Sequence, residues 1–290
     1  NLSYTHAWTL QPRFTDTRDF DHEHGTSGSR DAKIETLLYG MQENRPITAP
    51  IVSIDRLLGR FAGGRWVLVN AALTSPLSGE VLANLAQHAS IGAVDMEPRP
   101  TFATFYEGEE PSLMLRLKGG HTTGKGSVTV TVVNSAGSVV ETKTAPITLS
   151  KYATHTRIAL NSISPLLPGY YEARCELRLA ESGLTLTRTT GFWVYDEAFL
   201  LNASPISVNH DYFVRDGIPY PIMGTTYMAG DTHRKFLLEP NPAVWERDFS
   251  SMKRAGVNWV RTGVWTSWKR YMLDPGTMEE GVLRAFTAFL

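Results

Sequence analysis

The middle third of the chain alternates between apolar and polar side chains in short runs. "SLMLRLK" (112–118) places its leucines on one face, and "SVTVTVV" (127–133) places Val128, Val130 and Val132 on one face. Turn residues follow at 134–137 and again at 181–183. Period-two alternation broken by hairpin turns is typical of an antiparallel β-sandwich, which we predict over residues 96–197.

Residues 1–95 give a mixed α/β pattern. Ile34, Leu37, Leu38 and Met41 recur at helical spacing, which predicts a helix over 29–41. Strands are predicted over 49–57 and 63–73, and a short helix over 79–89. This segment is either the tail of a larger upstream domain or a small domain that leans on the sandwich.

Residues 198–290 change to alternating strands and helices. Strands are predicted over 221–229 and 257–265, with a helix over 241–256 between them and another over 277–290. Asn241 is placed to cap the first helix, and Pro242 suits its first turn. Val282, Phe286 and Phe289 share a face of the second helix. Strand, helix and strand at this spacing predict a βαβ unit with a parallel strand pair.

Two stretches resemble known families. "LPGYYEARCEL" (167–177) resembles the entry to a late strand in immunoglobulin-like accessory domains, so the sandwich is expected to be Ig-like. "DGIPYPIMGTTYM" (216–228) and "WERDFSSMKRAGVNWVR" (245–261), with the Trp-rich loop after them, resemble the opening of the (β/α)8 TIM barrel in clan A glycoside hydrolases. The resemblance implies a multidomain α+β protein in which the sandwich precedes the first two βα units of such a barrel.

Arg261 lies toward the C-terminal end of the second predicted parallel strand, where we expect a buried apolar environment. A buried cation needs acceptors, and barrel side chains at this end project into the catalytic mouth. The resemblance implies that Arg261 supports catalysis by holding a carboxylate nucleophile from another strand ionised. An ordinary structural ion pair with a helix carboxylate is the alternative.

Further candidates for substrate binding follow the two strands. Tyr227 and Trp265, at the strand ends, are predicted to stack on a sugar ring, or else to pack as core or loop aromatics. Trp268 belongs to an outer subsite or makes a plain loop contact. Asp231 and His233 in the first βα loop are predicted to meet substrate hydroxyls, with a solvated loop as the alternative.

The resemblance implies that the catalytic glutamates lie beyond Leu290, because clan A enzymes carry them on the fourth and seventh strands. We therefore assign no catalytic residue in this chain and expect the chain alone to be inactive. The predicted function is the N-terminal portion of a retaining glycoside hydrolase that acts on β-linked glycosides or polysaccharides. The rest of the barrel comes from the same or a separate polypeptide. A non-catalytic sandwich module that binds carbohydrate or protein, with a structural barrel-like segment, is the alternative.

The composition limits the classes of possible binding partner but identifies none. The net charge is −1, and the 28 basic residues form no block, which argues against a nucleic-acid or anionic-membrane partner. No apolar run approaches the length of a membrane span. No cofactor is indicated, and the compartment cannot be assigned.

Two features have possible metal chemistry. Cys175 is the only cysteine and lies on an apolar strand face, which favours packing over reactivity. "DFDHEHG" (19–25) is rich in potential ligands, but consecutive residues seldom point at one ion. A polar loop is the preferred interpretation, so no metal site is assigned.

Overall fold

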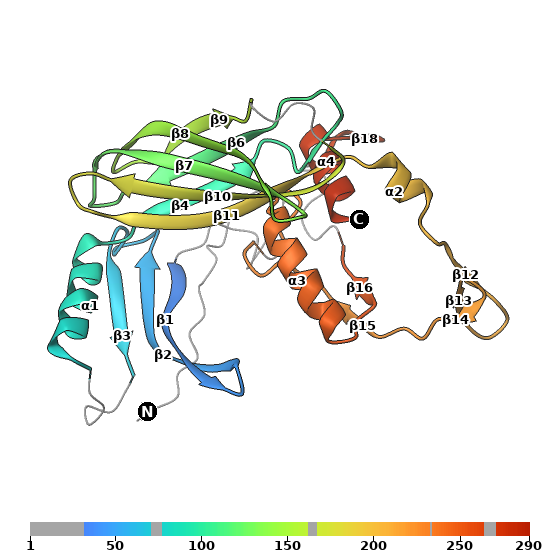
Figure 1. The fold of residues 1–290 in the computed structure, drawn as a ribbon, viewed down its shortest axis with the longest axis horizontal. Helices are drawn as coiled ribbons and strands as arrows, with labels where there is room; N and C mark the ends of the chain where they lie inside the picture. Colours follow the sequence, from blue (N-terminus) through green and yellow to red (C-terminus); the bar gives the residue numbers. More distant parts are fainter. Residues whose placement is uncertain (1–31, 71–76, 162–166, 233, 264–270) are drawn as a thin grey trace.

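The computed structural model describes residues 32–70, 77–161, 167–232, 234–263 and 271–290. These residues form a β-rich structure with four helices, in which a five-stranded sheet packs on a three-stranded sheet and the other elements lie around this pair (Figure 1). No helix among the described residues combines the length and apolarity that crossing a bilayer requires.

Residues 95–194 form a sandwich of two sheets, as the alternating pattern predicts. One sheet has the order β4-β6-β9: β4 (Asp95–Pro100), β6 (Ser112–Lys118) and β9 (Thr154–Ala159). The other has the order β5-β11-β10-β7-β8: β5 (Thr104–Phe105), β7 (Gly124–Asn134), β8 (Val139–Leu149), β10 (Gly169–Leu179) and β11 (Thr185–Val194). All pairs are antiparallel except β5 with β11.

One hydrophobic cluster fills the sandwich. The leucines of β6 and the alternate valines of β7 (Val128, Val130 and Val132) are buried in it, at 1% exposure or less. They pack with Cys175 and Phe192 from β10 and β11. Burying these alternate side chains removes apolar surface from water, at about 25 cal/mol per Å², so the inward-facing pattern of the sequence is also what stabilises the two layers.

The first described segment is an antiparallel sheet followed by a helix: β1 (Ala32–Gln42), β2 (Arg45–Arg56), β3 (Arg65–Val69) and α1 (Gly79–Ile91). The predicted helix over 29–41 is therefore wrong in its described part. Register shifts between Thr36 and Met41 move successive side chains to a different face. Such bulges break the period of two and imitate helical spacing.

After the sandwich come α2 (Glu197–Leu201) and a small antiparallel sheet of β12 (Ile206–Val208), β13 (Phe213–Arg215) and β14 (Ile218–Pro219). The small sheet lies well away from the sandwich, at the end of an extended stretch (Figure 1). A βαβ unit then follows, in which β15 (Gly224–Thr226) and β16 (Trp259–Arg261) pair in parallel and α3 (Pro242–Arg254) connects them. The hairpin β17 (Met272–Asp274) and β18 (Thr277–Met278) leads into α4 (Glu280–Phe289).

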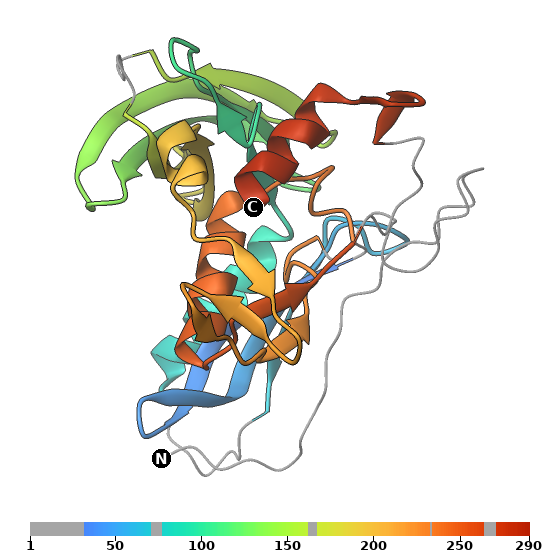
Figure 2. The same cartoon turned by 90° about the vertical axis from the view of Figure 1, so that its right-hand side faces the viewer.

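A second hydrophobic cluster holds α3 and α4 together beside the sandwich, with Ala103 contributed by the sandwich itself. Figures 1 and 2 place α3 and α4 along one end of the sandwich and the β1–β3 sheet along another part of it. The predicted buried face of α4 is right for Val282 and Phe289, whereas Phe286 is 37% exposed and Ala285 is buried instead.

Candidate functional site

The parallel strands β15 and β16 end side by side. Thr226 is the register partner of Arg261, and the next backbone N–H, that of Tyr227, donates to the carbonyl of Arg261 at 2.8 Å. Thr262 Oγ1 donates to the carbonyl of Tyr227 at 3.3 Å. The first two predicted strand ends therefore meet at one edge, where the carboxyl ends of parallel strands bring side chains together.

Arg261 is exposed, so the predicted buried environment is wrong for the described structure. Val260 packs on the cluster around α3 and α4, and alternation along the strand directs Arg261 and Trp259 to the opposite face. No described residue covers that face enough to bury either side chain. No described carboxylate pairs with the Arg261 guanidinium, so its role beside a nucleophile stays a prediction.

Tyr227 lies in the core, only 5% exposed. Its ring packs against Phe236, Phe249 and Phe289 with centroid distances of 4.9–6.3 Å. Its hydroxyl donates to Asp248 Oδ2 at 3.1 Å, and burial, followed by the charge of Asp248, raises the pKa of the phenol. This is the core-packing alternative, because the ring faces that would stack on a sugar are covered.

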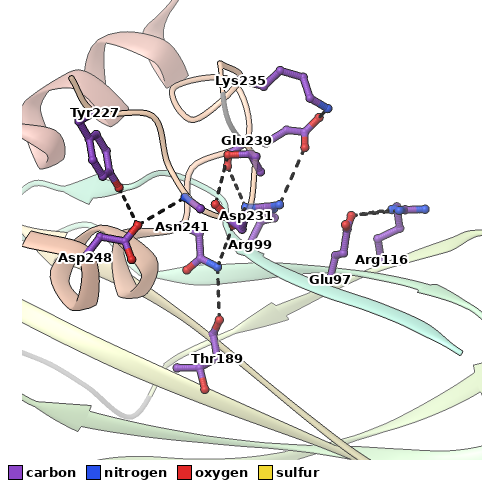
Figure 3. Close-up of polar contacts among 12 residues, drawn as sticks. Glu97, Arg99, Arg116, Thr189, Tyr227, Asp231, Lys235, Glu239, Asn241 and Asp248 are labelled. Carbon is purple, nitrogen blue, oxygen red and sulfur yellow. Dashed lines mark hydrogen bonds and ion pairs between the residues drawn. The ribbon is translucent and has the colours of Figure 1, made fainter. Parts of the chain in front are cut away.

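Asp231 lies where the first βα loop contacts the sandwich. We call this contact, made by Arg99 with Asp231 and Glu239, the join. Arg99 from β4 donates Nη1 to Asp231 Oδ2 at 3.4 Å and to the carbonyl of Glu239 at 2.8 Å (Figure 3). Lys235, itself 7% exposed, donates Nζ to Glu239 Oε1 at 2.6 Å. The loop after β15 is thus tied to a sandwich arginine by charge-assisted hydrogen bonds, which are stronger and more directional than neutral ones.

Asn241 begins α3 in position but does not cap it with its side chain, so this detail of the prediction is wrong. The Asn241 amide instead donates to the carbonyl of Thr189 at 3.4 Å and to Asp231 Oδ2 at 3.5 Å. Its contacts with Thr189 and Asp231 occupy the Asn241 side chain, which would otherwise be available to cap the helix N-terminus. His233, Trp265 and Trp268 lie outside the described residues, and so does the 19–25 cluster.

A polar cleft of about 740 Å³ opens beside this join. Its lining comes from three parts of the chain: β1 and the turn after β2, the outer face of β4 and β6 with β11, and residues 231–247. On the β4–β6 face Arg116 donates Nη2 to Asp95 Oδ2 at 2.8 Å and Nε to Glu97 Oε2 at 3.1 Å. Burial and the charge of Glu97 raise the pKa of Asp95. The cleft falls in the size range of small-molecule sites.

Asp231 is the one substrate-binding candidate from the sequence that lines this cleft among the described residues; the other lining residues were not predicted. Lys33, Arg99 and Arg188 come from separate strands, and only the fold brings them near Asp231. The one available signal was "DMEPRP" (95–100), whose alternate charges belong to the outer face of a strand. Nothing in that pattern specifies the elements that cover the face.

Metal chemistry gains no support from the described residues, which contain no group of three or more potential ligands. Cys175 is fully buried in the sandwich, and burial raises the pKa of its thiol to about 12. A thiol with that pKa is neither a nucleophile nor a ready metal ligand near neutral pH.

No family model matches the sequence, and no curated protein matches it. Among solved structures, β-glucuronidase of Bacteroides uniformis aligns at a TM-score of 0.29 and 16% identity, over 67% of this chain and 22% of that one. β-Glucuronidase of Parabacteroides merdae aligns at 0.30 and 18%, over 68% and 23%. A β-galactosidase of Bacteroides fragilis, named as putative, aligns at 0.27 and 13%, over 68% and 27%.

The chain spans about a quarter of the length of these neighbours. All three are glycosidases by name, but TM-scores below 0.5 establish no common fold. The function is therefore argued from the residues of this chain.

Proposed function

We propose that this chain is the N-terminal portion of a retaining glycoside hydrolase acting on β-linked glycosides or polysaccharides. The observation that carries the proposal is the unit β15–α3–β16, with its strand ends joined and Arg261 on the face opposite the helices. In a (β/α)8 barrel the helices lie outside, so the opposite face of the strands is the barrel interior. Arg261, at the C-terminal end of β16, then faces the catalytic mouth.

The apolar surface of the C-terminal segment supports a barrel completed by further polypeptide. Of the 28 exposed large hydrophobic side chains in the described residues, 16 lie within 199–290, which is less than a third of the chain. Trp259 is among them, on the same strand face as Arg261. An apolar surface of this kind is rarely left exposed to water, so we propose that remaining barrel units, from the same or a separate polypeptide, cover it.

The proposed division of roles follows from this placement. Two glutamates from the remaining units supply the acid/base and the nucleophile, about 5–5.5 Å apart as retaining enzymes require. Arg261 steadies the nucleophile in its ionised form by a charge-assisted hydrogen bond. Asp231, His233, Trp265 and Trp268 are proposed to contact the carbohydrate, with Asp231 already oriented by Arg99.

The test is hydrolysis of a panel of aryl β-glycosides by the intact protein carrying Arg261→Ala. Loss of a preorganised donor at a reacting centre lowers kcat by roughly 10²–10³-fold, and we expect a loss of that size. Arg254→Ala is the matched control, because Arg254 is an exposed arginine at the end of α3 that donates Nη2 to Ser251 Oγ on the same helix.

Activity of Arg261→Ala within threefold of the Arg254→Ala control would reject the assigned role. Wild-type protein inactive on every β-glycoside would reject the hydrolase itself and favour the binding module. An unchanged melting temperature in both variants would show that any loss comes from the reaction rather than from unfolding.

A further inference from the structure

One end of the polar cleft brings together cations whose carboxylate partners among the described residues are absent or, for Arg188, weak. Lys33 on β1 lines this end, and its ammonium makes no hydrogen bond or ion pair with any residue that the structure describes. Arg188 on β11 faces the same space, with its side chain 14% exposed. Lys118 on β6 also lines the cleft, and among the described residues its Nζ donates to the carbonyl of Leu57, at 3.0 Å.

The guanidinium of Arg188 also has fewer acceptors among the described residues than it has N–H donors. Its Nη1 donates to the carbonyl of its neighbour Thr187 at 2.8 Å, and its Nη2 lies 3.5 Å from Oε2 of Glu35, a side chain that is 47% exposed. Its Nε is buried and has no partner within the described chain. A buried donor without an acceptor destabilises the folded protein, the more so when the group is charged, so Arg188 gains from any acceptor that enters the cleft.

The carboxylates of the cleft do not balance these cations. Its lining holds seven lysines and arginines against four carboxylates. Asp95 and Glu97 are engaged by Arg116, while Asp231 and Glu239 are engaged by Arg99 and Lys235. Outside the lining, Glu35 lies 3.5 Å from Arg188 and Asp248 lies 3.2 Å from Arg247. The excess positive charge of the cleft is therefore carried by Lys33 and Lys118 and by the Nε side of Arg188.

We propose that this end of the cleft is a binding site for an oxyanion, a carboxylate or phosphate group, held by Lys33 and Arg188 with Lys118 at its edge. The guanidinium offers its free Nε and the ammonium its unused donors, and both form strong bonds to such oxygens. The cleft is much larger than a single ion, so it also accommodates the rest of a small organic molecule. The site does not depend on the proposed hydrolase activity.

The charge state of Lys33 agrees with this geometry. Burial, and then the charge of Arg188, lower the pKa of Lys33 to about 8, against the opposing influence of Glu35, Asp95 and Glu97. A bound anion stabilises the protonated amine. Binding is therefore strongest below pH 8 and weakens as the free amine loses its proton above that pH.

The experiment is isothermal titration of the intact protein, at low ionic strength and pH 7, with three probes. Inorganic phosphate and gluconate test the two oxyanions, and glucose is the uncharged counterpart of gluconate. We expect one or both anions to bind and glucose not to. Lys33→Met and Arg188→Met should each weaken binding roughly tenfold to a hundredfold, the equivalent of one charge-assisted contact.

Lys125→Met is the matched control, because Lys125 is an exposed lysine on β7 that does not line the cleft. It should bind like the wild type. Gluconate binding should be about tenfold weaker at pH 9.5 than at pH 7 in the wild type, and Lys33→Met should lose this dependence. No binding of either anion, equal binding of glucose, or wild-type affinity in Lys33→Met would overturn the proposal.

Discussion

Arg284→Ala should release α4 from the sandwich. Arg284 is 8% exposed although it is charged. Its Nη1 and Nη2 donate to the two carboxylate oxygens of Glu109 at 2.6 and 2.9 Å, and its Nε donates to Glu280 at 2.6 Å. The guanidinium also lies over the rings of Phe102 and Tyr106, at 4.1 and 4.7 Å from their centroids.

The magnitude follows from what the substitution leaves behind. Removing one partner of a fully buried ion pair costs about 3–5 kcal/mol. Glu109 is 35% exposed, so its carboxylate is partly rehydrated when Arg284 is gone. The lost stacking on two aromatic rings adds to the cost. We therefore expect α4 docking to weaken by about 2–3 kcal/mol, which corresponds to a roughly 30- to 150-fold increase in opening.

Hydrogen exchange followed by mass spectrometry measures this opening directly. Peptides from α4 should exchange faster by that factor in Arg284→Ala, whereas peptides from β10 in the sandwich should not change. Arg178→Ala is the matched control, because Arg178 also pairs with a glutamate, Glu176, but is 70% exposed. An exposed pair contributes about 0–1 kcal/mol, so the control should exchange like the wild type.

The ion pair of Arg284 with Glu109 also makes the docking of α4 depend on pH. The hydrogen bond from Arg284 lowers the pKa of Glu109 below its usual 4.5, with a further contribution from the backbone N–H of Tyr106 and against the effect of burial. A depressed folded pKa stabilises the protein above the unfolded value and loses that stabilisation as the pH falls through the folded value. The difference between wild type and Arg284→Ala should therefore shrink below pH 4.5. Equal exchange of α4 in both arginine variants at pH 7 would refute the reasoning.

Two more predictions concern the sandwich. Cys175, whose thiol pKa burial raises to about 12, should not react with an aromatic disulfide reagent at pH 8 until the protein is unfolded in guanidinium; a full equivalent of reaction in native buffer would contradict the assigned burial. Gly126→Ala places a Cβ 2.2 Å from the carbonyl oxygen of Arg178 and should destabilise by about 1–3 kcal/mol or more in urea denaturation. The control is Gly79→Ala, at a helix position with open space around the new Cβ, and it should be neutral or slightly stabilising. Equal urea midpoints for the two variants would show that the close approach of the Arg178 carbonyl to Gly126 does not determine stability.

The alternating pattern predicted the sandwich because burial of one face of each strand determines both the sequence pattern and the packing of the two sheets. Along β7 from 128 to 132 and along β10 from 171 to 179, every second side chain is buried, so the period of two in the sequence is the period of the core. The segment 32–42 was mispredicted because its bulges break that period, and a bulge leaves no mark in a single sequence. Period reasoning therefore works where the strand is regular and fails where the strand changes face.

The candidate site could be predicted from the sequence only in part, and the reason is different. The pairing of β15 with β16 follows from short-range signals, and so does the position of Arg261 at the strand end. The environment of a side chain depends instead on segments far away in the sequence. Arg99 and Asp231 are 132 positions apart, and Arg284 and Glu109 are 175 apart. No pattern within either segment specifies its partner, so both joins appeared only with the fold.

These two joins explain how the βαβ unit is oriented. Apolar contact alone fixes orientation weakly, because side chains can repack, whereas charge-assisted hydrogen bonds require defined directions. Arg99 reaches from the sandwich to the loop after β15, and Arg284 reaches from α4 back to the sandwich. The cations come from opposite sides of the boundary: one contact restrains the loop after β15, and the other restrains α4, which packs with α3 in the same hydrophobic cluster. The face of β15 and β16 that carries Arg261 is thereby held in place, and it stays open among the residues that the structure describes. Under the proposed function, this face would line the barrel interior once further strands pair with the edges of β15 and β16.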